Sequence, residues 1–335
     1  MLLGLDTGPL EMAKFYEGDY EYELATDLAH DIPRLRENLK TKEYLPAVRV
    51  FADSVQRIRD LHWLPVELLY VMQAVTVARA SALHRTGSDP MALLDKMTDA
   101  QEALASSIFT DMLKKIQEAP GGVFQHTWRV GNSHLKSLLQ AEIEGKEPPY
   151  KIVAVEAVLA AIITASYGAL ETLAEDIWIA ALNRHPLLAK NFMEANKDKK
   201  LDMLATFGDG LDLTHRMGSM LVKTRKVQFQ TFYDFKNAYE QSVPKEIADP
   251  LFSDCSGVLL AEKVRHLIAH RGGIVDAKFK QEMGDFSGSG YDEIKVGEQL
   301  RFDGPIVALH LESCLDMGRA IILAVDEWSC TAPTN

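Results

Sequence analysis

Residues 154–182 read AVEAVLAAIITASYGALETLAEDIWIAAL, and this stretch does most to set the fold class of the chain. Its large apolar side chains recur every three or four residues, as on one face of an α-helix; they are Leu159, Ile162, Ile163, Tyr167, Leu170, Leu173, Ile177 and Ile179. The apolar run 157–170 lies between Glu156 and Glu171 and is about 14 residues long, whereas a membrane-spanning helix needs roughly 20. We therefore expect a buried core helix and not a membrane anchor.

Helical patterns also fill the chain before this stretch. Residues 48–61 repeat apolar side chains at spacings of three and four, and Pro65 is expected to begin a new helix, because proline is tolerated in a first turn. Ser88 and Asp89 form a cap that is followed by Pro90, and this pattern is expected to open the next helix. A further helix is expected over about 127–145. Helices joined by such short turns pack as antiparallel neighbours.

A candidate domain boundary follows at 144–150, EGKEPPY, where two prolines and a charge cluster interrupt the helical period. We place a helical domain of unknown role at 1–146 and a second helical domain at 150–330. In the second domain, helices are expected around 187–196, 201–207, 212–222, 229–241, 256–270 and 306–328. The stretch 294–305 alternates in polarity and contains turn residues, so it allows a small β-hairpin. The predicted fold class is all-α, built from antiparallel helical bundles.

The composition predicts a cored globular protein and limits its partners. The 335 residues are 47% hydrophobic and 25% charged, with a net charge of −12. Any RNA would therefore have to be bound by a local basic surface and not by bulk attraction. The cysteines, Cys255, Cys314 and Cys330, are odd in number and lack CxxC spacing, which fits a reducing cytoplasm. The first residues lack the pattern of a signal peptide, so we expect a cytoplasmic location.

An arginine followed after four residues by a histidine occurs four times, at Arg57–His62, Arg79–His84, Arg129–His134 and Arg265–His270. The spacing alone therefore identifies no site. The fourth copy differs in its context, RHLIAHRGG over 265–273. A polar residue, His266, follows the arginine, aliphatic residues fill the middle, and Gly272 and Gly273 can end a helix in the left-handed conformation. This segment is the candidate site.

The residue types in this segment suit the cleavage of RNA without a metal ion. That reaction needs one group to deprotonate the 2′-hydroxyl, one to protonate the leaving 5′-oxygen, and a cation beside the phosphate. Histidine suits the proton transfers because its pKa lies near neutrality, and the arginine fork suits two phosphate oxygens. His266 and His270 share one helix face. Arg265 is displaced from His270 by about 140°, which its long side chain can span.

The segment resembles the motif of HEPN domains, small helical bundles whose ribonuclease members carry an arginine followed after four to six residues by a histidine. The resemblance covers about 150–330 and includes the order of elements: a long first helix with acidic residues, the motif helix, a hairpin-like piece and a final helix. It implies a homodimer in which two motif helices face one cleft. It also implies RNA cleavage without a cofactor in a prokaryotic antiviral defence or toxin-like system, with a protein partner or antitoxin.

The resemblance further implies that His270 is the general acid or base, that Arg265 binds the scissile phosphate, that His266 orients or assists, and that Glu171 holds Arg265. Other interpretations of these residues stay open. Arg265 and His270 could form a surface helix end that offsets the helix dipole, and Glu171 could be a solvated carboxylate. His266 and His270 could hold a metal, but no third ligand is adjacent in the sequence, so no metal site is expected.

A second feature is the stretch 214–233, THRMGSMLVKTRKVQFQTFY, which has no acidic residue. It combines the cations His215, Arg216, Lys223, Arg225 and Lys226 with the aromatic residues Phe229, Phe232 and Tyr233. Cations beside aromatic rings are typical of single-stranded RNA recognition. We expect RNA to be bound by Arg216, Lys223, Arg225 and Lys226, together with Arg271 of the candidate site. The other interpretation is a helix and loop with buried aromatic rings and solvated cations.

Other chemistries are not indicated, since the sequence has no P-loop, no dinucleotide-binding glycine motif, no HExxH and no nucleophile elbow. The alternative to a ribonuclease is a non-catalytic HEPN-like module for dimerisation or for binding RNA or protein. The position of His270 separates the two. A dimer in which both His270 side chains face one solvent-open, positively lined cleft favours catalysis, whereas a His270 inside the packed core favours the binding module.

Overall fold

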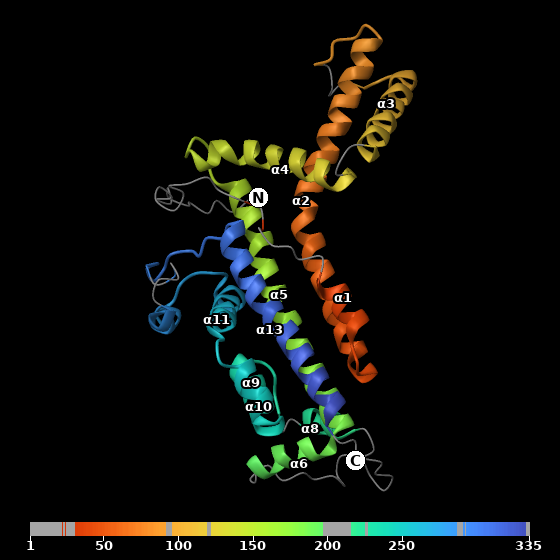
Figure 1. Cartoon of the computed structure of the whole chain (residues 1–335). Coiled ribbons are helices and arrows are strands. Elements are labelled where there is room, and N and C mark those ends of the chain that lie inside the picture. The colour runs from red at the N-terminus through yellow and green to blue at the C-terminus, as the bar shows by residue number, and fades with distance from the viewer. Residues whose placement is uncertain are drawn as a thin grey trace. The chain divides into compact units, whose positions relative to one another are not determined.

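The computed structural model describes residues 22, 24, 31–91, 96–118, 122–196, 216–224, 227–286, 291 and 293–332. In this part of the chain the regular structure is helical, which confirms the predicted all-α class (Figure 1). The helices are α1 (Asp31–Asn38), η1 (Lys42–Tyr44), α2 (Leu45–Arg85), α3 (Asp99–Gln117), α4 (Gly122–Ile143), α5 (Tyr150–Arg184), α6 (Pro186–Ala195), α8 (Met217–Lys223), α9 (Phe232–Ser242), α10 (Lys245–Leu251), α11 (Ser256–Arg271), α12 (Ala277–Glu282), η2 (Met283–Phe286) and α13 (Gly304–Thr331).

The chain divides into two compact units, at positions that differ from the boundary placed at 144–150. Unit 1 comprises Met1–Glu23 and Asp60–Val158, and unit 2 comprises Leu24–Arg59 and Leu159–Asn335. The helices α2 and α5 therefore each contribute residues to both units. The segment 144–149 is the connection between α4 and α5, and the division itself falls inside α5.

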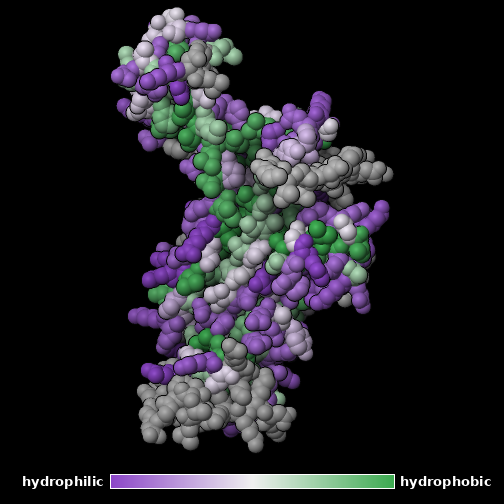
Figure 2. Space-filling model, turned by 180° about the vertical axis from the view of Figure 1, so that it is seen from behind, coloured by the Kyte–Doolittle hydropathy of each residue, from purple (hydrophilic) through white to green (hydrophobic). Residues whose placement is uncertain are grey.

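In unit 1, the second half of α2 packs closely against α4. A Cβ atom at Gly131 of α4 would lie 2.2 Å from the backbone oxygen of Val66, so glycine is needed for this approach. This half of α2 also carries a row of exposed apolar side chains; they are Leu64, Leu68, Val71, Met72 and Val75. Figure 2 shows hydrophobic surface among hydrophilic areas on the face that it draws.

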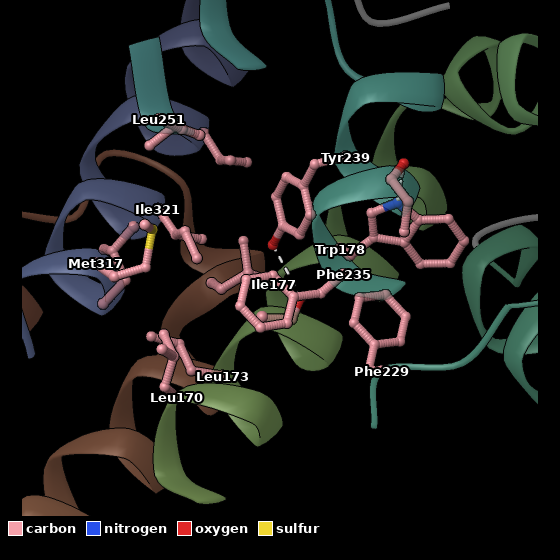
Figure 3. Close-up of a cluster of buried hydrophobic side chains, with 14 of the residues drawn as sticks. Leu170, Leu173, Ile177, Trp178, Phe229, Phe235, Tyr239, Leu251, Met317 and Ile321 are labelled. Atoms are coloured by element: carbon pink, nitrogen blue, oxygen red, sulfur yellow. Dashed lines mark hydrogen bonds between the residues drawn. The ribbon is translucent and has the colours of Figure 1, made fainter. Parts of the chain in front are cut away.

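In unit 2, α13 and the second half of α5 run side by side and form the centre of the core (Figure 1). Gly318 of α13 packs closely against both α2 and α5: a Cβ atom there would lie 2.7 Å from Phe51 of α2 and 3.1 Å from Leu173 of α5. Figure 3 shows the same core from inside, where Trp178 and Tyr239 are fully buried but keep polar partners. The Trp178 indole donates to the Ser242 hydroxyl at 2.9 Å, and the Tyr239 hydroxyl donates to the Ala174 carbonyl oxygen at 2.8 Å.

Two predicted helix starts are wrong. Pro65 lies inside α2, which continues through it, so this proline starts no new helix. The helix expected from Pro90 begins instead at Asp99. There Thr98 and Gln101 form a capping box, in which each side chain accepts a hydrogen bond from the backbone N–H of the other residue. This reciprocal cap satisfies two free N–H groups at once.

The stretch 294–305 does not fold back on itself as a hairpin. Among the described residues its one antiparallel bridge joins Gln299 to Ile274, just after α11. Its residues therefore pair with the end of the candidate site segment. Two helical stretches are long and apolar enough to cross a membrane by length and composition alone, Lys42–Arg85 and Tyr150–Arg184. The apolar window of the first stretch is 33% buried within the protein, and that of the second is 50% buried.

Candidate functional site at the end of α11

Helix α11 carries the candidate site and is fixed by its apolar face. Val258, Ala261, Val264 and Leu267 are buried, at spacings of three, and the helix packs against α13 (Figure 1). The helix ends at Gly272, whose φ of 61° is left-handed and whose N–H donates to Ile268 at 3.0 Å. A left-handed residue at this position is favourable only for glycine and a few polar residues.

The chain after α11 is secured by the stretch around Gln299. The N–H of Leu300 donates to the Gly273 oxygen and the N–H of Val275 donates to the Glu298 oxygen, both at 2.8 Å. The Gln299 side-chain amide donates to the Gly272 oxygen at 2.8 Å. Sequence analysis assigned no role to Gln299, because a contact between segments 27 residues apart leaves no local signal. This stretch holds the last turn of α11 in place.

His266 and His270 lie together on the solvent side of α11. Both side chains are exposed, and their ring centroids are 4.4 Å apart with an angle of 47° between the rings. Partial burial, helped by the charges of His270 and Lys278, lowers the pKa of His266. The lowered pKa favours the neutral form of His266, which can accept a proton, and the His270 ring lies beside it. The His270 side chain lies outside the core, so its position does not favour the non-catalytic binding module.

Arg265 points from the same helix toward α5. Its guanidinium forms an ion pair with Glu171 at 3.2 Å and lies 5.1 Å from the ring centroid of Tyr167. The structure therefore brings Glu171 and Arg265 into contact, although the catalytic role of the pair stays a prediction. Tyr167 is fully buried and forms the platform below the arginine. Sequence analysis placed Tyr167 on the apolar face of its helix and assigned it no role at the site.

Two carboxyl groups beside Arg265 are partly buried, which disfavours their charged form. Burial raises the pKa of Glu171 although the charge of Arg265 opposes this shift. Burial also raises the pKa of Glu262, which accepts a hydrogen bond from the Phe232 N–H at 3.1 Å. The charge of the Arg265 guanidinium thus lowers the pKa of both Glu171 and Glu262 and opposes the effect of their burial. Its side chain remains 31% exposed, and an arginine offers five N–H donors, so a phosphate could still reach it from solvent.

The expected RNA-binding residues fall into two groups. Arg271 is exposed at the end of α11 and contacts Asp276 at 3.3 Å. Arg216 and Lys223 flank α8, where Gly218 packs against Ile179, eight residues beyond Glu171 along α5. At 1.5 Å per residue, Ile179 lies about 12 Å from Glu171 along the axis of α5. Arg225, Lys226 and His215 lie outside the described residues.

The aromatic residues of the same stretch mostly do not face solvent. Phe229 and Phe232 are each 3% exposed and belong to the core of unit 2. For these two rings the fold therefore agrees with the other interpretation of the stretch, in which the aromatic side chains are buried. Tyr233 is 69% exposed and remains available for stacking.

Within the described parts of the chain, no group of three or more histidine, cysteine or acidic side chains is arranged to hold a metal ion. No protein-family model, no curated protein and no solved structure matches this chain. The chemistry of the α11 end therefore has to be inferred from its own residues.

Proposed function

We propose that this protein is a metal-independent RNA endonuclease of HEPN type that acts as a homodimer through residues 265–273. The observation that supports it most is the exposed pair of His266 and His270 rings, 4.4 Å apart at a helix end that also carries Arg265. Two imidazoles and a guanidinium can supply the base, the acid and the phosphate-binding cation that transphosphorylation of RNA uses.

The proposed division of labour follows from the surroundings of each side chain. His270 is the exposed ring nearest the helix end, and it is proposed as the group that donates a proton to the leaving 5′-oxygen. His266, with its lowered pKa, is proposed to accept the 2′-hydroxyl proton or to orient His270. Arg265, positioned by Glu171, would bind the phosphate with its free N–H donors.

A homodimer is proposed because one exposed helix end leaves the substrate open to solvent on most sides. Two copies of α11 facing each other would enclose the phosphate and supply a second set of cations. The prokaryotic defence or toxin-like setting, with a protein partner or antitoxin, is proposed from the HEPN resemblance alone.

The test is RNA cleavage by the full chain in EDTA. We expect products with 2′,3′-cyclic phosphate and 5′-hydroxyl ends, because the 2′-oxygen is the nucleophile, and no cleavage of a matched strand of DNA. Cleavage of DNA at a similar rate, or a strict need for added magnesium, would contradict the proposal.

A further inference from the structure

We infer that His266 and His270 form a chelating site for a transition-metal ion such as Zn²⁺, and that the ion inhibits the proposed nuclease. The two rings lie on one face of α11 with their centroids 4.4 Å apart, and both are exposed. A zinc ion sits about 2.0–2.1 Å from each imidazole nitrogen that it binds, so two rings this close can share one ion after small rotations about their side-chain bonds.

The surroundings of the pair are compatible with a bound cation. Neutral imidazole is a preferred ligand of zinc. The end of a helix presents its carbonyl dipoles, which favour positive charge. Lys263 and Lys278 lie nearby, and both contact the Glu282 carboxylate, at 3.6 and 4.0 Å, so one negative charge balances part of their two positive charges. Water would complete the coordination, so binding should be weaker than in a structural zinc site with four protein ligands.

The inhibitory consequence rests on the proposed function, whereas the binding itself does not. A metal on the ring nitrogens prevents them from accepting or donating protons. The ion would therefore oppose cleavage without being needed for it, and the expected activity in EDTA follows from the same site.

The experiment is calorimetric titration of Zn²⁺ alone into the full chain after EDTA treatment and its removal. We expect one saturable site per chain, with affinity reduced about tenfold or more in His266→Ala and in His270→Ala. His84→Ala, which removes an exposed histidine of another Arg-x4-His copy, should bind as the unchanged protein does. No saturable binding up to about 0.1 mM zinc, or equal affinity in all three variants, would overturn the site.

The nuclease proposal and the metal-site proposal can each be refuted without the other. If zinc binds through His266 and His270 and also stops RNA cleavage over the same concentration range, both are supported. If zinc binds in this way but the protein cleaves no RNA, the metal site stands and the nuclease is refuted. If RNA is cleaved but zinc does not bind, the nuclease stands and the metal site is refuted.

Discussion

The diglycine end of α11 offers a quantitative test of how the candidate site is held. Gly272 and Gly273 both have left-handed backbones, with φ of 61° and 83°. An alanine at Gly272 would have nothing within 4 Å of its Cβ atom, so it should cost only backbone strain, about 1–2 kcal/mol. An alanine at Gly273 carries the same strain, but its Cβ atom would lie 2.5 Å from the Gln299 amide nitrogen.

That contact determines the expected difference between the two variants. An ordinary contact begins near 3.4 Å, so the Gln299 amide must retreat by about 1 Å. Its 2.8 Å hydrogen bond to the Gly272 oxygen would then be lost. One such bond is worth about 1 kcal/mol. We expect Gly273→Ala to be less stable than Gly272→Ala by that amount, or about 2–4 °C in melting temperature for a unit of this size.

The assay is a double-mutant cycle read by urea and thermal unfolding. With Gln299→Ala as background, the clash and the bond are both absent, so Gly273→Ala should cost no more than Gly272→Ala. The coupling between positions 273 and 299 should therefore be about 1 kcal/mol, against about 0.3–0.5 kcal/mol for independent sites. Additive effects would refute the argument that Gln299 secures this helix end.

Two further predictions concern charge around the site. Because the pKa values of Glu171 and Glu262 are raised in the fold, the native state holds more protons than the unfolded chain just above pH 4.5, so stability falls as pH rises through this range. In Glu171→Gln this fall, measured by melting temperature from pH 4.5 upward, should be smaller; an unchanged fall would count against the burial argument. For RNA binding, Arg271→Gln should lower the slope of log affinity against log salt by about 0.7, the value for one phosphate contact on a single strand. Lys223→Gln should do the same if RNA extends to α8. An unchanged slope in Arg271→Gln would show that RNA does not contact the α11 end.

Sequence analysis predicted what local patterns determine. The helix over 256–270 was recovered because it has apolar residues on one side and a diglycine at its end. The long core helix 154–182 was recovered from its spacing of three and four. Pro65 was predicted to begin a helix because proline is tolerated in a first turn. That rule does not predict where a long helix such as α2 continues through a proline in its interior. The start of α3 was misread because the Thr98 capping box was not weighed against Pro90.

What the sequence could not supply are the contacts between distant segments. Nothing local indicates that Tyr167 lies under Arg265, because the two are almost a hundred residues apart. Phe229 and Phe232 resembled a base-stacking surface because cations precede them, but burial is a property of the whole core. The proximity of the His266 and His270 rings, by contrast, follows from helical spacing once the helix is known.

The most direct test of the central claim is the rate of RNA cleavage in EDTA by the full chain and by His270→Ala. General acid–base catalysis by a positioned histidine contributes about 10²–10⁴-fold, so the variant should lose at least about a hundredfold. Arg265→Ala should show a comparable loss, whereas His84→Ala should cleave at the unchanged rate. If the unchanged protein cleaves RNA in EDTA and His270→Ala cleaves it equally fast, the end of α11 is not the active site.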